Sequence, residues 1–165
     1  MIDQTRRRVL AAIAGSAFAL AGGAAQAACS NKTIRGDYAF TVQGNILSED
    51  GTRVLALLNG LGIISYDGNG NLVQQDLIVA NGKPPAGGPQ NSSGFTTGET
   101  GTYTVNSDCT GTQRLVLGPG NELNLALVVS NNGNSVHSLV TSGTANGVPT
   151  NFQTRGDAER INPRD

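Results

Sequence analysis

Three short segments rich in glycine and asparagine constrain the fold of this chain most strongly. They are Asp67 to Asn71 (DGNGN), Gly118 to Asn121 (GPGN) and Asn131 to Asn134 (NNGN), each set between runs of β-forming residues. Asn, Asp and Gly adopt the backbone angles that tight hairpin turns require. Lys, Glu and Met, which favour helices, are scarce, whereas Gly, Asn, Thr and Ser are abundant. The sequence therefore predicts an all-β protein.

The alternation of apolar and polar residues between these turns predicts about eight strands. A short turn after Ser30 is the one helix candidate beyond the N-terminal region, and a loop rich in Gly, Pro and Ser spans residues 81–93. The predicted strands span residues 37–43, 53–66, 72–79, 94–105, 112–117, 122–129, 135–142 and 151 to about 161.

Consecutive antiparallel strands in this number bury their apolar rows either by closing into an up-and-down barrel or by folding as a β-sandwich. The regular succession of hairpins favours the barrel, and Gly60 and Gly62 permit the sharp coiling that closure requires. A sandwich would need longer crossovers, and only the loop at 81–93 is long enough. We therefore predict a single antiparallel barrel of roughly eight strands, with the sandwich as the alternative.

The first 27 residues have the features of an export signal. Three arginines at positions 6–8 precede an Ala-rich apolar run from Val9 to about Ala21, and Ala25-Gln26-Ala27 is a small-x-small cleavage site. The arginines also resemble the twin-arginine pattern, and ordinary secretion stays open as an alternative. We expect residues 1–27 to be a cleaved signal peptide and residues 28–165 to form one β-barrel domain, exported to the periplasm or the extracellular space.

The chain has two cysteines, Cys29 and Cys109. Two cysteines in an exported protein most often form one disulfide, which here would tie the new N-terminus to a distant turn. Without residues 1–27 the chain has 8 basic and 11 acidic side chains, a net charge of about −3 with neither sign clustered, so nucleic acid is not an expected partner. No segment after the export signal has the length and apolar character of a membrane span.

Several spaced motifs carry a resemblance. They are GDYAF at Gly36 to Phe40, YDGNGN at Tyr66 to Asn71, GTYTV at Gly101 to Val105 and DCTGT at Asp108 to Thr112. Together they resemble the signature of a group of small exported bacterial proteins of unknown function, similar in layout to lipocalin-like and allene-oxide-cyclase-like barrels. The resemblance implies a calycin-like or allene-oxide-cyclase-like barrel. It implies no established activity, and no catalytic residue is carried over from it.

The residues that commonly carry catalysis or bind metals are few. His137 is the only histidine, so a multi-histidine metal site is excluded, and a Ser-His-Asp triad would have to recruit a serine and an acid from elsewhere. No Gly-x-Ser-x-Gly motif marks such a serine. The segment beginning at Asp67 lacks the glutamate that closes an EF-hand loop, because position twelve is Ile78. We therefore assign no catalytic residue, no metal ligand and no cofactor.

A barrel of this size could hold a small apolar or amphipathic ligand between its walls. For Tyr38 and Tyr103 a second interpretation is open, in which both are core residues near one barrel end and their hydroxyls bond backbone groups. The candidates for the ligand lining are Tyr38, Phe40, Tyr103, Leu123, Leu125 and Leu127.

The predicted strand at 53–66 is apolar on both faces. One row can fill the barrel, whereas the other needs a cover, which could be a loop, the N-terminal segment or a second subunit. A homo-oligomer contact through this strand is therefore predicted beside burial by the protein's own chain. The two rows are Val54, Ala56, Leu58, Ile64 and Tyr66, and Leu55, Leu57, Leu61 and Ile63.

Three functions from different classes stay open, in the following order. The first is a structural or interaction protein of the bacterial envelope whose barrel is filled by side chains. The second is a binding module for a small apolar or amphipathic ligand, and the third is a cyclase-like or isomerase-like enzyme. Unfilled volume inside the barrel separates the first two. A charged pair inside a cavity, for instance Arg114 with Glu122, would favour the third.

Overall fold

The structure is a computed structural model that describes residues 28–84 and 89–162. The predicted signal peptide, residues 1–27, lies outside the described residues. A short 3-10 turn, η1 (Asn31–Ile34), follows Ser30 as the sequence predicts, and a second, η2 (Asn131–Gly133), joins the sixth and seventh strands. The strands are β1 (Gly36–Leu47), β2 (Val54–Tyr66), β3 (Asn71–Ala80), β4 (Thr96–Val105), β5 (Thr110–Gly118), β6 (Asn121–Ser130), β7 (Ser135–Ala145), β8 (Val148–Pro149) and β9 (Asn151–Arg160).

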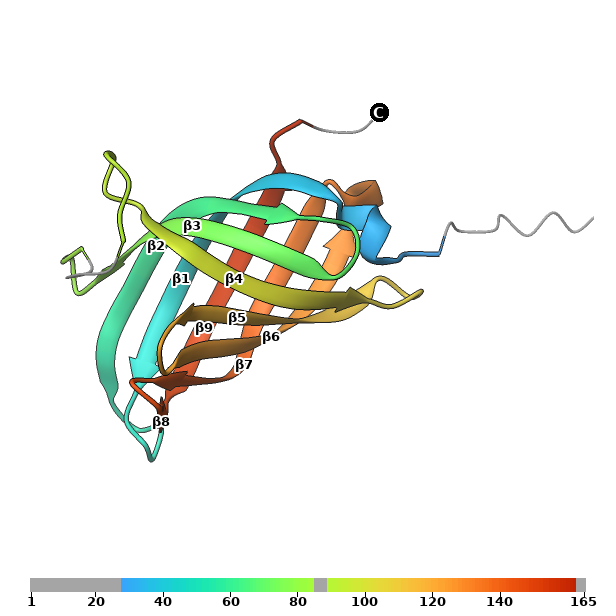
Figure 1. The fold of residues 1–165 in the computed structure, drawn as a ribbon. Coiled ribbons are helices and arrows are strands. Elements are labelled where there is room, and N and C mark those ends of the chain that lie inside the picture. Colours follow the sequence, from blue (N-terminus) through green and yellow to red (C-terminus); the bar gives the residue numbers. More distant parts are fainter. Residues whose placement is uncertain (1–27, 85–88, 163–165) are drawn as a thin grey trace, which may run out of the picture.

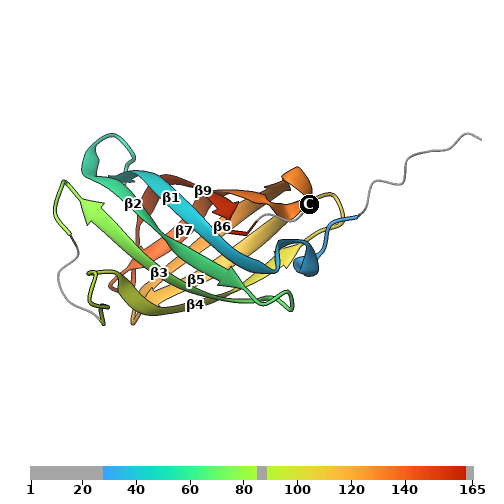
Figure 2. The same ribbon diagram turned by 90° about the horizontal axis from the view of Figure 1, so that it is seen from above.

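Eight of these strands close into one antiparallel barrel (Figures 1 and 2). Each strand from β1 to β7 pairs with the next, β7 also pairs with β9, and β9 returns to β1. The two-residue strand β8 pairs with the end of β7 inside the connection to β9. This closure confirms the predicted barrel and excludes the sandwich. Several strands run further than predicted, most clearly β1, which continues to Leu47, whereas β4 begins at Thr96 and not at residue 94.

The glycines of β2 leave room for large side chains that point into the barrel from β1. Gly62 pairs with Phe40, and a Cβ atom at Gly62 would lie 2.7 Å from the Phe40 ring and 2.3 Å from the carbonyl oxygen of Gln75. Such a separation is shorter than any real carbon contact, so an alanine here would force the wall apart. The glycine therefore permits the tight coiling of this part of the sheet, as expected for a small barrel.

One end of the barrel is closed by three buried tyrosines. The rings of Tyr38 and Tyr66 meet edge to face with centroids 5.5 Å apart, and those of Tyr66 and Tyr103 lie 4.8 Å apart. The Tyr38 hydroxyl donates to the carbonyl of Gly133 in η2. The Tyr103 hydroxyl donates to the carbonyl of Asn31 at 3.1 Å and accepts from the backbone N–H of Gly68 at 2.8 Å. Backbone groups thus satisfy both hydroxyls.

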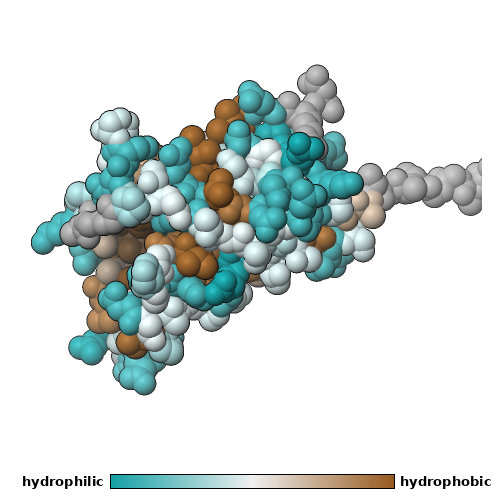
Figure 3. Space-filling view, in the orientation of Figure 1, coloured by the Kyte–Doolittle hydropathy of each residue, from teal (hydrophilic) through white to brown (hydrophobic). Residues whose placement is uncertain are grey.

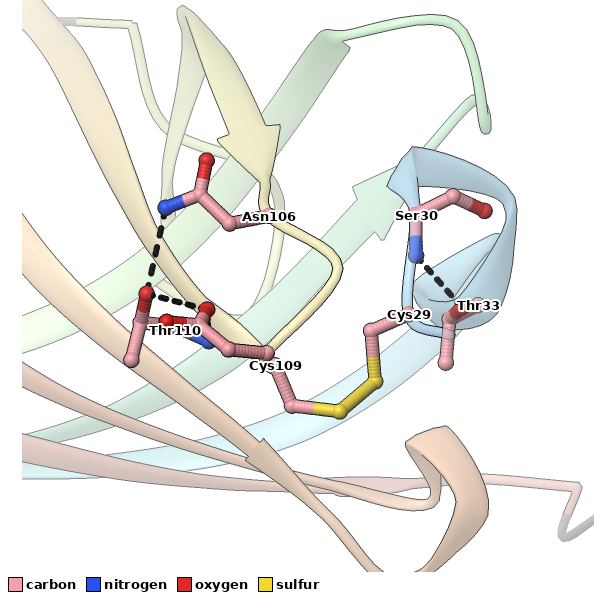
Figure 4. Close-up of a disulfide and its surroundings, with 7 residues drawn as sticks. Cys29, Ser30, Thr33, Asn106, Cys109 and Thr110 are labelled. Atoms are coloured by element: carbon pink, nitrogen blue, oxygen red, sulfur yellow. Dashed lines mark hydrogen bonds between the residues drawn. A yellow bond between two sulfur atoms is a disulfide. The ribbon is translucent and has the colours of Figure 1, made fainter. Parts of the chain in front are cut away.

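The N-terminal segment covers this closed end and is fixed there by the disulfide between Cys29 and Cys109 (Figure 4). The bridge confirms the predicted pairing, with the two Cα atoms 5.0 Å apart. Cys109 lies in the turn between β4 and β5. Next to the bridge, the side-chain oxygen of Asn31 accepts a hydrogen bond from the backbone N–H of Val105 at 2.7 Å. The described part of the N-terminal segment, from residue 28, therefore closes one end of the barrel and does not cover the outside of β2.

The outer apolar row of β2 stays open to solvent within the described part of the chain. Leu55, Leu57 and Leu61 are each more than half exposed. Leu57 borders a shallow depression of about 650 Å³ on the outer wall, together with Val79 of β3 and Leu139 of β7. The predicted cover by the N-terminal segment or by a loop is thus absent from the described residues. The homo-oligomer contact through this strand stays a prediction.

Candidate functional site: a cavity inside the barrel

Above the tyrosines the barrel is hollow. The cavity measures about 800 Å³ and is lined by inward-facing residues from all eight barrel strands. In the space-filling view, apolar surface lines a hollow at the left of the molecule, at the end opposite η1 (Figure 3). This volume lies within the range of small-molecule binding sites. Large apolar residues on its wall include Phe40, Ile64, Ile78, Leu115, Leu123 and Phe152.

The candidates for the ligand lining fall into two groups. Phe40, Leu123 and Leu125 line the cavity. Tyr38, Tyr103 and Leu127 instead lie in the packed core at the closed end, where each is at most 3% exposed. Alternation assigns all of them to the inside of the barrel, but the depth along each strand decides whether an inward side chain meets packed neighbours or open volume.

Two acidic side chains point into the cavity from neighbouring strands. Asp76 of β3 and Glu99 of β4 both line it, and both are about 5% exposed. The side-chain amide of Gln74 lies between them, and its nitrogen donates to Asp76 Oδ2 at 3.0 Å and to Glu99 Oε2 at 2.9 Å. We call Gln74, Asp76 and Glu99 the carboxyl cluster. One neutral amide thus bridges two carboxyl groups that sit side by side on the barrel wall.

A local irregularity of β4 begins next to the carboxyl cluster. Gln74 pairs with Glu99, but two residues further along β3, Asp76 pairs with Thr96, so β4 contains one extra residue. This extra residue forms a β-bulge. Gly98 lies in the bulge with φ +83°, a conformation that glycine adopts without strain. The bulge places both Thr96 and Glu99 on the cavity wall, although strict alternation would separate them onto opposite faces.

Burial raises the pKa of both carboxyl groups above their ordinary values. The charge of Asp76 raises the pKa of Glu99 further. Two such groups retain a proton between them that two exposed carboxylates would lose. Near neutral pH the pair therefore carries one negative charge and one shared proton. No lysine, arginine or histidine of the described residues forms a salt bridge with either carboxyl group.

Polar groups of two other kinds line the same cavity. The Tyr66 hydroxyl donates to the side-chain oxygen of Gln113 at 2.8 Å, beside the closed end. On the far side, Thr154 of β9 is 5% exposed, and its hydroxyl has no hydrogen-bond partner among the described residues. A buried hydroxyl without a partner is energetically unfavourable, so Thr154 is a group that a guest or a water molecule would satisfy.

The charged pair named from the sequence lies outside the cavity. Arg114 and Glu122 do form an ion pair, at 2.6 Å, but their side chains are 49% and 39% exposed. Arg114 lies between the inward-facing Gln113 and Leu115, and alternation along β5 therefore directs it outward. The buried charged residues that line the cavity, among those described, are Asp76 and Glu99 instead.

His137 has the two partners that a hydrolytic triad would require. Its Nε2 lies 3.2 Å from Ser130 Oγ, and its Nδ1 lies 2.8 Å from Asp157 Oδ1. This is the order of contacts in a Ser-His-Asp triad. The side chains of His137 and Asp157 are each half exposed on the outer wall, however, and none of the three residues lines either of the two hollows described above. The trio therefore serves as an outer link between β6, β7 and β9.

The sequence contains a signal for the carboxyl cluster that lies outside the recognised motifs. Asp76 belongs to the same row as Leu72 and Ile78, and Glu99 to the same row as Tyr103. An acidic residue in a row that otherwise points inward marks either an error in the assigned face or a functional group. Both residues lie on the cavity wall, so the assigned face is correct and the two acids are candidates for the site.

The chain matches no protein-family model and no curated protein. The resemblance to small exported barrel proteins therefore stays a prediction. No helix of the described residues is long and apolar enough to cross a membrane.

Proposed function

We propose that this protein is a binding module that holds a small amphipathic ligand inside its barrel. The observation that carries this proposal is the unfilled volume of about 800 Å³. A barrel with a purely structural role has no need of such a volume, because empty space in a protein interior costs stability. The volume favours the binding module over the filled barrel among the hypotheses that the sequence left open.

The composition of the wall supports an amphipathic ligand over a purely apolar one. Aliphatic and aromatic side chains form most of the lining, and a few polar groups interrupt it at fixed places, as in sites that orient a bound molecule. These groups are the carboxyl cluster on one side and the unpartnered hydroxyl of Thr154 on the other. A hydrocarbon alone would offer no partner to the charge of the carboxyl pair or to the Thr154 hydroxyl.

An exported location supports the same proposal. A disulfide persists in oxidising compartments, and the Cys29–Cys109 bridge is compatible with one. Together with the predicted signal peptide, it supports a role in the periplasm or outside the cell. There the protein would meet small molecules from the environment or from the envelope.

A matched pair of tryptophan variants tests the binding proposal. Val42 points into the cavity, and Thr41 lies next to it on the outer face of β1. The neutral apolar fluorophore N-phenyl-1-naphthylamine should bind the wild type and Thr41→Trp with enhanced emission, whereas Val42→Trp should lose at least tenfold in affinity. Equal titration curves for the two variants, or no binding to the wild type, would contradict a ligand site inside the barrel.

The carboxyl cluster favours a second candidate function, a cyclase-like or isomerase-like enzyme. A carboxyl group and a carboxylate that share a proton can donate a proton at one atom of a guest and accept one at another. The test is the identity of the bound molecule in an Asp76→Asn/Glu99→Gln variant. An enzyme would accumulate the unconverted substrate in this variant and the product or nothing in the wild type, whereas a binding module would hold one compound in both.

A further inference from the structure

We infer that the ligand is an amphipathic amine, whose protonated nitrogen binds the Asp76–Glu99 pair and whose apolar part extends toward the open end of the barrel. This inference rests on the proposed binding function and names the chemistry of the ligand. The inference follows from four features: the depth of the Asp76–Glu99 pair in the cavity, the charge of the pair, the partners available to it, and the unpartnered hydroxyl of Thr154.

The pair sits near the floor of the cavity. Along β4 the inward positions run from Tyr103 in the closed end through Gly101 to Glu99, and along β3 they run from Leu72 through Gln74 to Asp76. Above this level the wall is mainly apolar. Residues there include Val42, Ile46, Leu58, Ile78, Leu117 and Phe152. A guest that reaches the floor therefore meets acid at one end and hydrocarbon along the rest of its length.

The charge of the pair calls for a cation. A buried charge is normally paired, because the loss of hydration is otherwise uncompensated. The shared proton removes one of the two negative charges and leaves the other. In the described part of the chain this remaining charge has hydrogen bonds from Gln74 but no ion pair within 4 Å. Two described cationic residues also border the cavity, Lys83 in the loop after β3 and Arg155 of β9, and both are exposed.

An ammonium group suits this site better than a metal ion. Gln74 directs its N–H₂ group at both carboxyl groups, whereas a divalent cation would need the side-chain oxygen there. Among the described residues no third histidine, cysteine or carboxylate completes a metal-binding group. A protonated amine brings one positive charge and up to three donors, which the oxygens of Asp76 and Glu99 can accept.

Thr154 supplies the independent sign that the cavity is built to receive a guest. Thr154 lines the cavity from β9, away from the carboxyl cluster on β3 and β4, and its buried hydroxyl has no partner among the described residues. The carboxyl cluster alone could be a strained feature of the fold. Strain within the carboxyl cluster does not explain the unsatisfied hydroxyl of Thr154. This hydroxyl indicates a polar atom supplied from outside the chain.

The test compares three straight-chain compounds that differ at one end. Dodecylamine, dodecanol and dodecanoate, each below its micelle-forming concentration, compete with N-phenyl-1-naphthylamine for the full mature protein at pH 7. We expect dodecylamine to displace the fluorophore at a concentration at least tenfold below that of dodecanol, with dodecanoate the weakest competitor. In Asp76→Asn/Glu99→Gln the advantage of the amine over the alcohol should fall below threefold.

A double variant of the outer surface controls for net charge. Asp37→Asn/Glu122→Gln also removes one aspartate and one glutamate, both outside the barrel, and should keep the full preference for the amine. Equal displacement by all three compounds, or a preference for dodecanoate, would overturn the amine inference while leaving the binding function standing. Failure of the fluorophore and of every competitor to bind the wild type would overturn both. If Asp76→Asn/Glu99→Gln kept the preference for dodecylamine over dodecanol, the carboxyl pair would not be the group that recognises the amine.

Discussion

The guanidinium carbon of Arg160 lies 4.7 Å from the centroid of the Tyr38 ring. From this position the same guanidinium donates to the carbonyl of Gly133 at 2.9 Å and to the carbonyl of Thr33 at 3.1 Å. Arg160 thereby joins the last strand of the barrel to η1, to η2 and to the first strand. These contacts hold the closed end of the barrel together, and the cavity lies above this end.

We expect Arg160→Leu to lower the free energy of unfolding by about 3 kcal/mol or more, because it leaves several buried carbonyls without their charged donor. Arg155→Leu, on the exposed face of the same strand, should cost well under half as much. Urea unfolding of the two variants measures the difference. Equal losses would mean that Arg160 does not hold the closed end together.

Reduction of the Cys29–Cys109 disulfide should destabilise the protein substantially. The bridge closes a loop with a sequence separation of 80 residues. In the chain-entropy model a loop of this size is worth about 4.5 kcal/mol as an upper value. Melting with and without reductant should show a clear fall in the thermal midpoint, and limited proteolysis should cut near η1 first. An unchanged midpoint would contradict the role given to the bridge.

The two faces of β6 should respond very differently to truncation. Leu127 is 2% exposed in the packed core, whereas the next residue, Val128, is 52% exposed on the outer wall. Leu127→Ala should cost about 2–5 kcal/mol of unfolding free energy, and Val128→Ala about 0.5 kcal/mol or less. Chemical denaturation of both variants tests the assignment. A larger loss for Val128→Ala would show that the strand faces the other way.

The carboxyl cluster should make stability fall as the pH rises. The pKa of Asp76 and that of Glu99 are raised in the folded protein by burial. Above the ordinary carboxyl pKa of about 4, the folded protein therefore binds more protons than the unfolded chain, and its stability declines with increasing pH. Asp76→Asn/Glu99→Gln should melt several degrees above the wild type at pH 8, and the difference should shrink toward pH 4. If the difference in melting temperature grew toward low pH, the raised pKa of the carboxyl pair would be contradicted.

Much of the fold follows from local features of the sequence. The DGNGN turn joins β2 to β3, and alternation places Leu125 and Leu127 on the inner face of β6, because hairpin turns and period-two patterns are properties of neighbouring residues. The disulfide also follows, since the chain has only two cysteines to pair. These features required no knowledge of contacts across the barrel.

The candidate site could not be predicted in the same way, because it depends on depth and on a bulge. Alternation cannot tell that Tyr103 is in the closed end and that Glu99, two inward positions away, borders open volume. The bulge at Gly98, which places Thr96 on the same face of β4 as Glu99, is equally hidden in the sequence. His137 shows the same limit, because its contacts with Ser130 and Asp157 arise only when β6, β7 and β9 lie side by side.

The contents of the cavity provide the most direct test of the account. Wild type and Val42→Trp, purified in parallel from the organism that makes the protein, would be extracted with organic solvent and the extracts compared by mass spectrometry. The account predicts an amphipathic amine in the wild-type extract, close to one molecule per chain, and its loss from the Val42→Trp extract. Extracts that match, with no compound enriched in the wild type, would contradict a ligand site in the barrel.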